Sequence, residues 1–211
     1  MIKIEKTSIY GWEESIRGMR NPKNSWYRSD SGWWEDEEGD TVFKLGPNDA
    51  DLMRRLCKGG PVHAKFRRMI VVYVDINAPF YWWKEFDTYK VGTVCNSCST
   101  MHKIHAKEFS VDDFSVERVT GEAGRQLIQS IVDYLNYNRK MYNETKDKQY
   151  WENMIQILPT SYNQTRTILF NYEVLNNIYH SRLFHKLTEW HKICAWIESL
   201  PHSWLITGKE N

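Results

Sequence analysis

Residues 68–76 have the sequence RMIVVYVDI, which is the clearest strand signal in the chain. β-Branched and aromatic residues dominate this run, charged residues flank it, and Asn77-Ala78-Pro79 closes it. We therefore predict a central strand over Arg68–Ile76. Pro79 suits the first turn of a helix, where a missing N–H has no consequence, so a helix is predicted over Phe80–Tyr89.

The remaining patterns predict two further strands and a series of helices. The N-terminal residues 1–6 alternate apolar and charged side chains like a strand, and Thr41–Leu45 is a candidate short strand. Helical composition or spacing extends over Gly11–Met19, Ala50–Lys58, Gln126–Tyr142 and Trp151–Ile157, and most of the remainder to Ser199. Strands followed by long helices favour an α+β fold with a mixed sheet.

Between these elements, Ser29–Asp40 is rich in serine, glycine and acidic residues around Trp33-Trp34, which predicts a surface loop pinned by aromatics. Its acidic part, Glu35–Asp40, either covers a site or faces water. The sequence leaves these two alternatives open.

Length and composition limit the class of protein. The chain has 211 residues and a mass of 25.2 kDa, so a single domain over residues 1–211 is expected. The formal charge of +1 excludes a broad basic surface for nucleic acid. The longest apolar run, Met69–Val74, is far shorter than the roughly 20 residues of a membrane span. We expect a cytoplasmic protein that does not associate with membranes.

Four cysteines in a chain of this size are too few and too scattered for a disulfide scaffold, so reduced thiols are expected. Cys95-x-x-Cys98 is followed by His102 and His105, which are zinc-type ligands. Structural zinc sites take their second ligand pair from a segment about a dozen or more residues away. We therefore predict two small packed thiols beside exposed histidines, and no metal.

Two other residue groups have both a structural and a functional interpretation. Trp82-Trp83 could stack on a planar ligand, but large aromatics at a helix start usually fill a core or an oligomer interface. Arg17, Arg20 and Lys23 bracket a turn and could hold a phosphate, although such clusters are more often solvated. The signatures G-x-S-x-G, G-x-x-x-x-G-K-[ST] and G-x-G-x-x-G are all missing from the sequence.

The C-terminal region contains the most informative polar pair. Asn171 and Arg182 are 11 positions apart, which at about 100° per residue places them on nearly the same face of a helix. Their neighbours Leu175 and Ile178 are apolar, so each polar head needs a partner at a packed surface. The partner of Arg182 is either an internal carboxylate or a bound anion such as phosphate.

Two blocks of sequence resemble the flavin-dependent thymidylate synthases. In the second block, Leu158-Pro159 is followed by Asn171 twelve residues after the proline, then by Asn177 six residues later and Arg182 five after that. The family has the same order of Leu-Pro, Asn, Asn and Arg. By this resemblance, Asn171 and Asn177 would contact flavin and Arg182 the nucleotide.

The first block is the strand ending in Asn77-Ala78-Pro79, the helix after it, and Asn96–Ser99. It resembles the family strand and the helix that carries an Arg-His-Arg signature. Here the triplet falls on Thr88–Lys90, so only Lys90 keeps a positive charge, while Ser99 matches the family serine. Other family positions have changed: Ser97 replaces an acid, and Met101 and Ile155 replace arginines.

The resemblance spans residues 66–197 and implies methylation of dUMP, or a related pyrimidine nucleotide, with FAD, methylenetetrahydrofolate and NADPH. It also implies a homotetramer, with Asn171, Asn177 and Lys90 at the cofactor and Arg182 and Ser99 at the nucleotide. Because flavin chemistry needs no catalytic triad, a sequence without the hydrolase, phosphate-loop and dinucleotide signatures agrees with this enzyme hypothesis. The alternatives are a non-catalytic nucleotide-binding or protein-interaction member of the same fold, and a helical protein without a small ligand.

Overall fold

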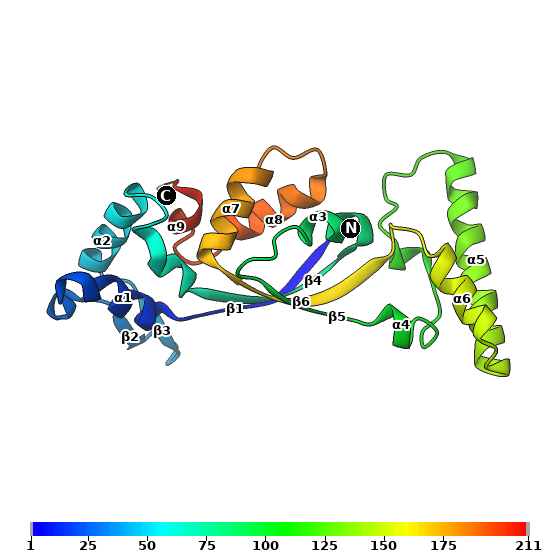
Figure 1. Cartoon of the computed structure of the whole chain (residues 1–211), viewed down its shortest axis with the longest axis horizontal. Helices are drawn as coiled ribbons and strands as arrows, with labels where there is room; N and C mark the ends of the chain where they lie inside the picture. The colour runs from blue at the N-terminus through cyan, green and yellow to red at the C-terminus, as the bar shows by residue number, and fades with distance from the viewer. Residues whose placement is uncertain (1, 210–211) are drawn as a thin grey trace. The chain divides into compact units, whose positions relative to one another are not determined.

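The computed structural model describes residues 2–209. Its main sheet has four strands in the order β1-β4-β6-β5, and a separate hairpin pairs β2 with β3 (Figure 1). Helices and strands alternate irregularly along the chain, which confirms the predicted α+β class with a mixed arrangement of sheet and long helices. The strands are β1 Lys3–Tyr10, β2 Gly32–Glu35, β3 Thr41–Lys44, β4 Val71–Pro79, β5 Val94–Ser97 and β6 Asn163–Asn171.

The central strand is β4, as the opening sequence pattern predicts, but it begins and ends three residues later than predicted. Its buried side chains alternate along the strand: Val72, Val74, Ile76 and Ala78 are all buried, while Tyr73 between them is exposed. Alternate residues of a strand point to opposite faces, so one face of β4 supplies the core.

The structure corrects one part of the prediction that most of the chain between Leu158-Pro159 and Ser199 is helical. Residues 163–171 form β6, which lies between β4 and β5 in the sheet. Gln164, Ile168 and Phe170 are buried at even positions of this strand, and the polar run 163–167 conceals that period-two pattern in the sequence. Strand pairing with distant segments, rather than local composition, selects the extended form.

The predicted loop 29–40 is also wrong in part, because Gly32–Glu35 forms a strand. It pairs antiparallel with Thr41–Lys44, with Trp33 opposite Phe43. Asp36 closes the turn, since its Oδ1 accepts hydrogen bonds from the backbone N–H groups of Glu38 (3.1 Å) and Asp40 (2.8 Å). The acidic side chains at positions 35, 37, 38 and 40 are exposed.

The described chain divides into two compact units, each made of segments that are not contiguous in sequence. The first unit comprises residues 2–5, Asp75–Thr88 and Cys95–Thr167, and the second comprises residues 6–74, Tyr89–Val94 and 168–209. Strands β1, β4 and β6 contribute residues to both units. The single-domain organisation stays a prediction.

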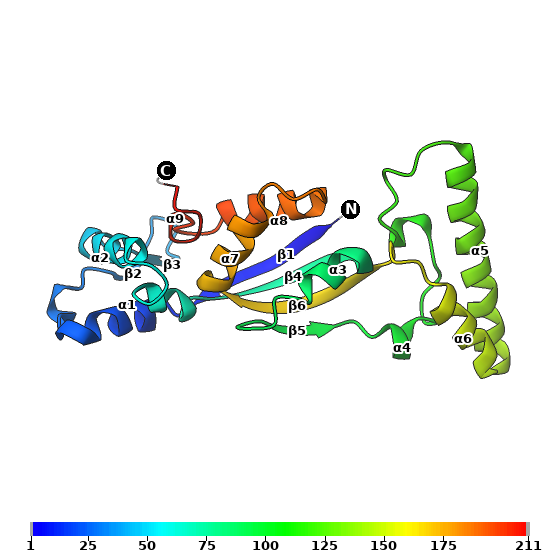
Figure 2. The same cartoon turned by 45° about the horizontal axis from the view of Figure 1, so that its top comes forward.

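The first unit is built on two neighbouring helices, α5 and α6, which lie side by side in Figures 1 and 2. Their inner faces enclose an apolar cluster of Ile104, Phe109, Phe114, Val132, Leu135 and Met154. Trp82 and Trp83 of α3 are almost fully buried, at 0% and 1% exposure, which confirms their predicted core role. The helices of this unit are α3 Phe80–Phe86, α4 Thr100–Lys103, the 3₁₀ turn η4 Val111–Asp113, α5 Glu122–Thr145 and α6 Lys148–Ile157.

The second unit contains the helices that follow β6. Helix α7 packs against α8, α9 and the 3₁₀ turn η3, and its residues Leu175 and Ile178 are fully buried. No helix within residues 2–209 combines the length and the apolar character needed to cross a bilayer. The helical elements here are α1 Trp12–Arg20, η1 Asn21–Lys23, η2 Trp26–Arg28, α2 Pro47–Lys58, η3 Ala64–Arg68, α7 Tyr172–Arg182, α8 Thr188–Glu198 and α9 Trp204–Thr207.

Candidate functional site

One short segment of the second unit, Tyr89–Val94, contacts both ends of α7. At the first end, Asn171 is the last residue of β6 and the N-cap of α7. Its Oδ1 accepts a hydrogen bond from Val174 N at 3.0 Å, and its Nδ2 donates to the carbonyl oxygen of Gly92 at 3.5 Å. Asparagine is a preferred N-cap residue because its side-chain oxygen satisfies a backbone donor of the first turn.

At the other end, Arg182 is the last residue of α7. Its Nε donates a hydrogen bond to Tyr89 Oη at 2.8 Å. Its guanidinium carbon lies 4.7 Å from the ring centroid of Trp190 and 5.5 Å from that of Tyr89. The contacts of the guanidinium thus include a hydrogen bond to a phenol and two aromatic rings, an arrangement that arginine suits because it is planar and weakly hydrated.

The structure corrects the expectation that Asn171 and Arg182 share a helical stripe. Asn171 precedes the helix and has an extended backbone, with φ −130° and ψ 165°. The two residues are brought to the same segment because Tyr89–Val94 runs along α7, not because helical periodicity aligns them. Lys90 belongs to this segment and is exposed.

Asn177 does not join this group of contacts. It is exposed on α7, and five positions at about 100° each separate it from Arg182 by about 140° around the helix. Ser99, in the first unit, is the N-cap of the short helix α4 and its Oγ accepts a hydrogen bond from His102 N at 3.1 Å. Both residues keep their predicted roles as proposals.

A large cavity in the second unit has the composition of an anion site. It encloses about 1460 Å³ between α1, α2 and the segment Gly59–Met69. Among the charged residues of its lining, basic side chains outnumber the acidic Asp51, and the 80% exposed ring of Tyr27 also lines it. The basic side chains are Arg20, Lys23, Arg28, Arg55 and Lys65.

The three basic residues that the sequence analysis placed around a turn, Arg17, Arg20 and Lys23, do not all contribute to this cavity in the same way. Lys23 lines it, whereas Arg17 lines a separate pocket. Arg20 is 4% exposed, and its Nε donates to the fully buried Asp49 at 2.6 Å. Because Asp49 neutralises Arg20, this arginine is a structural residue and not a phosphate ligand.

The wall of this cavity is joined to the start of α7. Lys65 and Phe66 of η3 line the cavity, and the next residue, Arg67, forms an ion pair with Glu173 at 2.7 Å. The backbone N of Tyr172 donates to the carbonyl oxygen of Ile70 at 3.0 Å. These contacts join the first turn of α7 to the segment that forms one wall of the cavity, although Asn171 itself does not line it.

The cysteine and histidine cluster does not form a metal site. Within residues 2–209, no group of three or more His, Cys, Asp or Glu side chains is arranged to hold a metal ion. Cys95 and Cys98 are exposed rather than packed, which corrects that part of the prediction. Burial of its sulfur nevertheless raises the pKa of Cys95, and Arg166 only partly offsets this, so its thiol is not activated.

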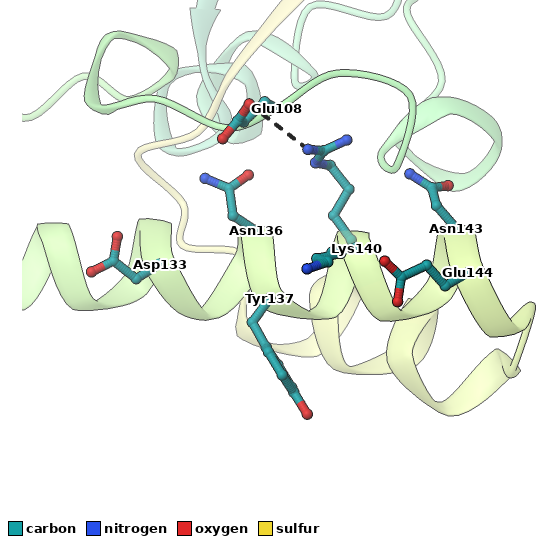
Figure 3. A pocket seen from close by; sticks show the side chains of 8 residues that line it. Glu108, Asp133, Asn136, Tyr137, Lys140, Asn143 and Glu144 are labelled. Atoms are coloured by element: carbon teal, nitrogen blue, oxygen red, sulfur yellow. Dashed lines mark ion pairs between the residues drawn. The ribbon is translucent and has the colours of Figure 1, made fainter.

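A polar pocket on α5 in the first unit encloses about 600 Å³, and none of the sequence-predicted residues lines it (Figure 3). Glu108 and Arg139 face one another across it at 3.9 Å, in the contact drawn as a dashed line. With Asp133, Lys140 and Glu144 the lining has three acidic and two basic side chains, so no large excess of one sign marks a ligand.

Three residues that contact Asn171 or Arg182 at the ends of α7 were not predicted from the sequence: Tyr89, Gly92 and Trp190. Tyr89 lies in the altered signature triplet, and that departure from the family pattern was the available signal. Gly92 follows the helix predicted over Phe80–Tyr89, and a glycine there indicates only a helix end. The position of Trp190 beside the guanidinium depends on how α8 packs against α7, and the sequence carries no signal for it.

Comparisons with known proteins identify the fold. No protein-family model matches the chain, and no curated protein sequence matches it. Two solved structures of flavin-dependent thymidylate synthase ThyX from Helicobacter pylori, both with FAD and dUMP, match with TM-scores of 0.68 and 0.69 at 16% identity. The matches cover 98% and 99% of this chain and 98% of each ThyX chain.

A third structure, the UMP/dUMP methylase PolB from Streptomyces cacaoi bound with 5-Br dUMP, matches with a TM-score of 0.61 and 13% identity. The match covers 99% of this chain and 95% of PolB. The chain therefore has the flavin-dependent thymidylate synthase fold over nearly its whole length, which confirms the fold implied by the two sequence blocks.

Proposed function

We propose that this protein binds FAD and a pyrimidine deoxynucleotide and methylates dUMP or a related nucleotide, as a thymidylate synthase-like enzyme. The observation that carries the proposal is the nearly full-length fold match to proteins solved with FAD and dUMP. The contacts of Asn171 and Arg182 with the segment Tyr89–Val94 agree with it, because the sequence resemblance assigns Asn171 to the flavin and Arg182 to the nucleotide.

The basic cavity supports binding of a dinucleotide cofactor. Ligand cavities usually enclose about 300–1,000 Å³, and this one, at about 1460 Å³, has room for an extended ligand. Lys23, Arg28 and Lys65 offer charge-assisted hydrogen bonds to a pyrophosphate, and Tyr27 offers a ring for stacking. These residues fit FAD, which carries two flat ring systems and two phosphates.

In this proposal FAD supplies the redox chemistry, and methylenetetrahydrofolate and NADPH supply the carbon unit and the reducing equivalents. The protein binds and orients the reactants. Asn171, Asn177 and Lys90 hold the flavin, while Arg182 and Ser99 hold the nucleotide. The resemblance further implies a homotetramer whose sites combine residues from several subunits.

Three positions that carry arginine in the family pattern lack charge here, and this limits how the phosphate is held. Met101 is 52% exposed, Thr88 is exposed, and Ile155 packs against the apolar cluster of the first unit. Lys90 and Arg182 therefore provide the positive charge of the proposed nucleotide site.

The first experiment is the visible absorption spectrum of the full-length protein before and after incubation with FAD and removal of the excess. A retained flavin spectrum supports the proposal and leads to assays with dUMP, methylenetetrahydrofolate and NADPH. The double variant Asn171→Ala/Arg182→Ala should lose flavin, whereas Arg125→Ala, which removes an exposed ion pair on α5, should keep it. A wild-type protein that takes up no FAD contradicts the cofactor assignment.

The second candidate function is a non-catalytic nucleotide-binding or protein-interaction member of this fold. It is favoured by the replacement of the Arg-His-Arg triplet by Thr88–Lys90. The variant Thr88→Arg/Tyr89→His tests it, because activity gained only in the variant indicates that catalysis was lost in this chain. Methylation by the unaltered protein would instead rule the second function out.

A further inference from the structure

The hairpin β2–β3 forms one wall of an aromatic cavity in the second unit that the proposed function does not use. The cavity encloses about 480 Å³, which lies within the range of about 300–1,000 Å³ for small-molecule sites. Its other walls come from β1, the start of α1 and the residues at the end of α8. The rings that line it are those of Trp12, Trp33, Phe43, Trp196 and His202.

The aromatic wall is preformed by contacts among these residues. Trp12 and Phe43 stack with their ring centroids 5.8 Å apart, and Trp33 lies edge-on to Phe43 at 5.3 Å. Trp196 is fixed by a hydrogen bond from its Nε1 to Thr7 Oγ1 at 3.0 Å. Trp33 is nevertheless 52% exposed, so its indole is accessible to a ligand.

The lining of the cavity carries no formal charge at neutral pH. Among the described residues that line it, none is Asp, Glu, Lys or Arg. Burial lowers the pKa of His202 below its ordinary value of 6.5, so this imidazole is neutral at pH 7. The cavity therefore offers no cation to a phosphate or a carboxylate, in contrast to the basic cavity beside α2.

The turn of the hairpin adds negative charge at the edge of this cavity. Thr41 lines the cavity and pairs with Glu35 across the hairpin. The turn between these two residues carries three further exposed carboxylates, those of Glu37, Glu38 and Asp40. Within residues 2–209 no ion pair neutralises any of these four acids, and Lys44 lies at the other end of the hairpin, opposite Gly32.

An aliphatic cation matches both the rings and the acids. An ammonium group is attracted by the face of an indole ring and by a cluster of carboxylates that no cation neutralises. The methylene groups between ammonium centres cover apolar surface, as the stems of lysine side chains do. A chain with several ammonium centres reaches from the rings to the turn, whereas a neutral aromatic ligand uses the rings alone.

We propose that the aromatic cavity and the acidic turn together bind a linear aliphatic polyamine. One ammonium group lies at the indole of Trp33, and the others lie at the carboxylates of the turn. The acidic segment Glu35–Asp40 thus borders a binding site. This inference is independent of flavin and nucleotide binding, so its failure leaves the proposed function as it stands.

The test is isothermal titration of the full-length protein with spermidine at low ionic strength. Trp33→Leu removes the accessible indole, and Glu37→Gln/Glu38→Gln removes two of the exposed charges. We expect each change to raise the spermidine dissociation constant about fivefold. Added salt should weaken binding to the wild type, because the carboxylates are exposed. A melting curve checks that each variant is folded.

Two matched controls make the same kinds of change outside the site. Trp34→Leu alters the neighbouring tryptophan of the hairpin, which is 44% exposed and is not among the described residues that line the cavity. Glu122→Gln/Glu144→Gln removes two exposed charges from α5. Both controls should bind spermidine like the wild type.

Three results would overturn the proposal. The first is a wild-type protein that does not bind spermidine. The second is equal binding by Trp33→Leu and wild type, which shows only attraction of counterions to the acids. The third is tighter binding of the peptide trilysine, which has the same net charge as spermidine, because it identifies the ligand as a basic peptide.

Discussion

The side chain of Asn171 and the backbone of Gly92 are in direct contact, with Asn171 Nδ2 3.5 Å from the carbonyl oxygen of Gly92. Gly92 has a φ of +78°, and a Cβ placed on it would lie 3.0 Å from Asn171 Nδ2 and 3.0 Å from Val174 Cγ2. The position therefore needs glycine for its backbone angle and also for the close approach to α7. This contact keeps Tyr89–Val94 against the helix that carries Arg182.

Replacing Gly92 with alanine should destabilise the protein and disturb the candidate site. Gly39→Ala is the matched control, because Gly39 has a φ of +86° with no atom within 4 Å of its added Cβ. The control carries only the left-handed backbone cost of about 1–2 kcal/mol, whereas Gly92→Ala adds the steric conflict. In urea, Gly92→Ala should lower the free energy of unfolding more than Gly39→Ala does. Equal losses for the two variants would contradict the close contact between Gly92 and α7.

Substitutions at Asn171 should separate its structural role from its proposed ligand role. Asn171→Ala removes the N-cap and should lower the free energy of unfolding by about 1 kcal/mol. Asn171→Asp keeps the cap acceptor for Val174 N but replaces the amide donor to Gly92 O with a carboxylate oxygen, so it should lose less stability than Asn171→Ala while flavin uptake falls. Thermal melts and FAD titration check both, and an Asp variant with full flavin affinity would remove Asn171 from the proposed cofactor site.

Asp49 is a buried carboxylate that joins several segments in the N-terminal part of the second unit through hydrogen bonds. Its fully buried carboxylate accepts hydrogen bonds from Arg20 Nε, Ser29 Oγ, Ser31 Oγ and the backbone N–H groups of residues 30 and 31. Asp49→Asn leaves Arg20 as a buried charge without its counterion, so unfolding measurements should show a loss of about 3–5 kcal/mol.

The control for this variant is Asp51→Asn, which breaks an exposed ion pair with Arg55. That pair spans 2.9 Å, but its side chains are 64% and 67% exposed, so the change should stay within about 0.5 kcal/mol. A similar small effect for Asp49→Asn would show that the buried pair does not hold the unit together.

The same carboxylate should make stability depend on pH. Burial by itself raises the pKa of Asp49, but hydrogen bonds from Ser31, Ser29 and Arg20 outweigh it, so its pKa lies below the ordinary value of 3.8. Because the folded-state pKa is depressed, the stabilisation is fully present above the ordinary value and is lost as the pH falls through the lowered pKa. The free energy of unfolding of wild type should therefore fall more steeply than that of Asp49→Asn as the pH is lowered below about 5. If the free energy of unfolding of the two proteins had the same dependence on pH, the lowered pKa of Asp49 would be contradicted.

Local patterns in the sequence were sufficient for the elements whose side chains repeat with a clear period. The alternation in β4 and the helical spacing in α5 are visible because each element buries one face against a core. The paired Trp82 and Trp83 could be assigned to the core for the same reason, since large rings stabilise a fold only when buried. The two blocks of family-like spacing then indicated the fold.

Only the tertiary structure showed that Asn163–Asn171 is a strand, and this changed the interpretation of the site. Its first five residues, NQTRT, carry no apolar stripe, and its neighbours β4 and β5 are distant in sequence. Pairing energy from such distant partners is not encoded in any local window. Because the strand ends at Asn171, that residue caps α7 rather than lying within a helix.

The sequence by itself determined the α+β class and the central strand, and its family-like spacing marked Asn171 and Arg182 as candidate site residues. The tertiary structure alone decided that Tyr89 and Trp190 hold Arg182 and that Arg20 belongs to Asp49. The physical reason is that hydrogen bonds and ring contacts act over a few ångströms in space. Their partners are set by how the chain folds back on itself, and spacing along the sequence carries no record of that.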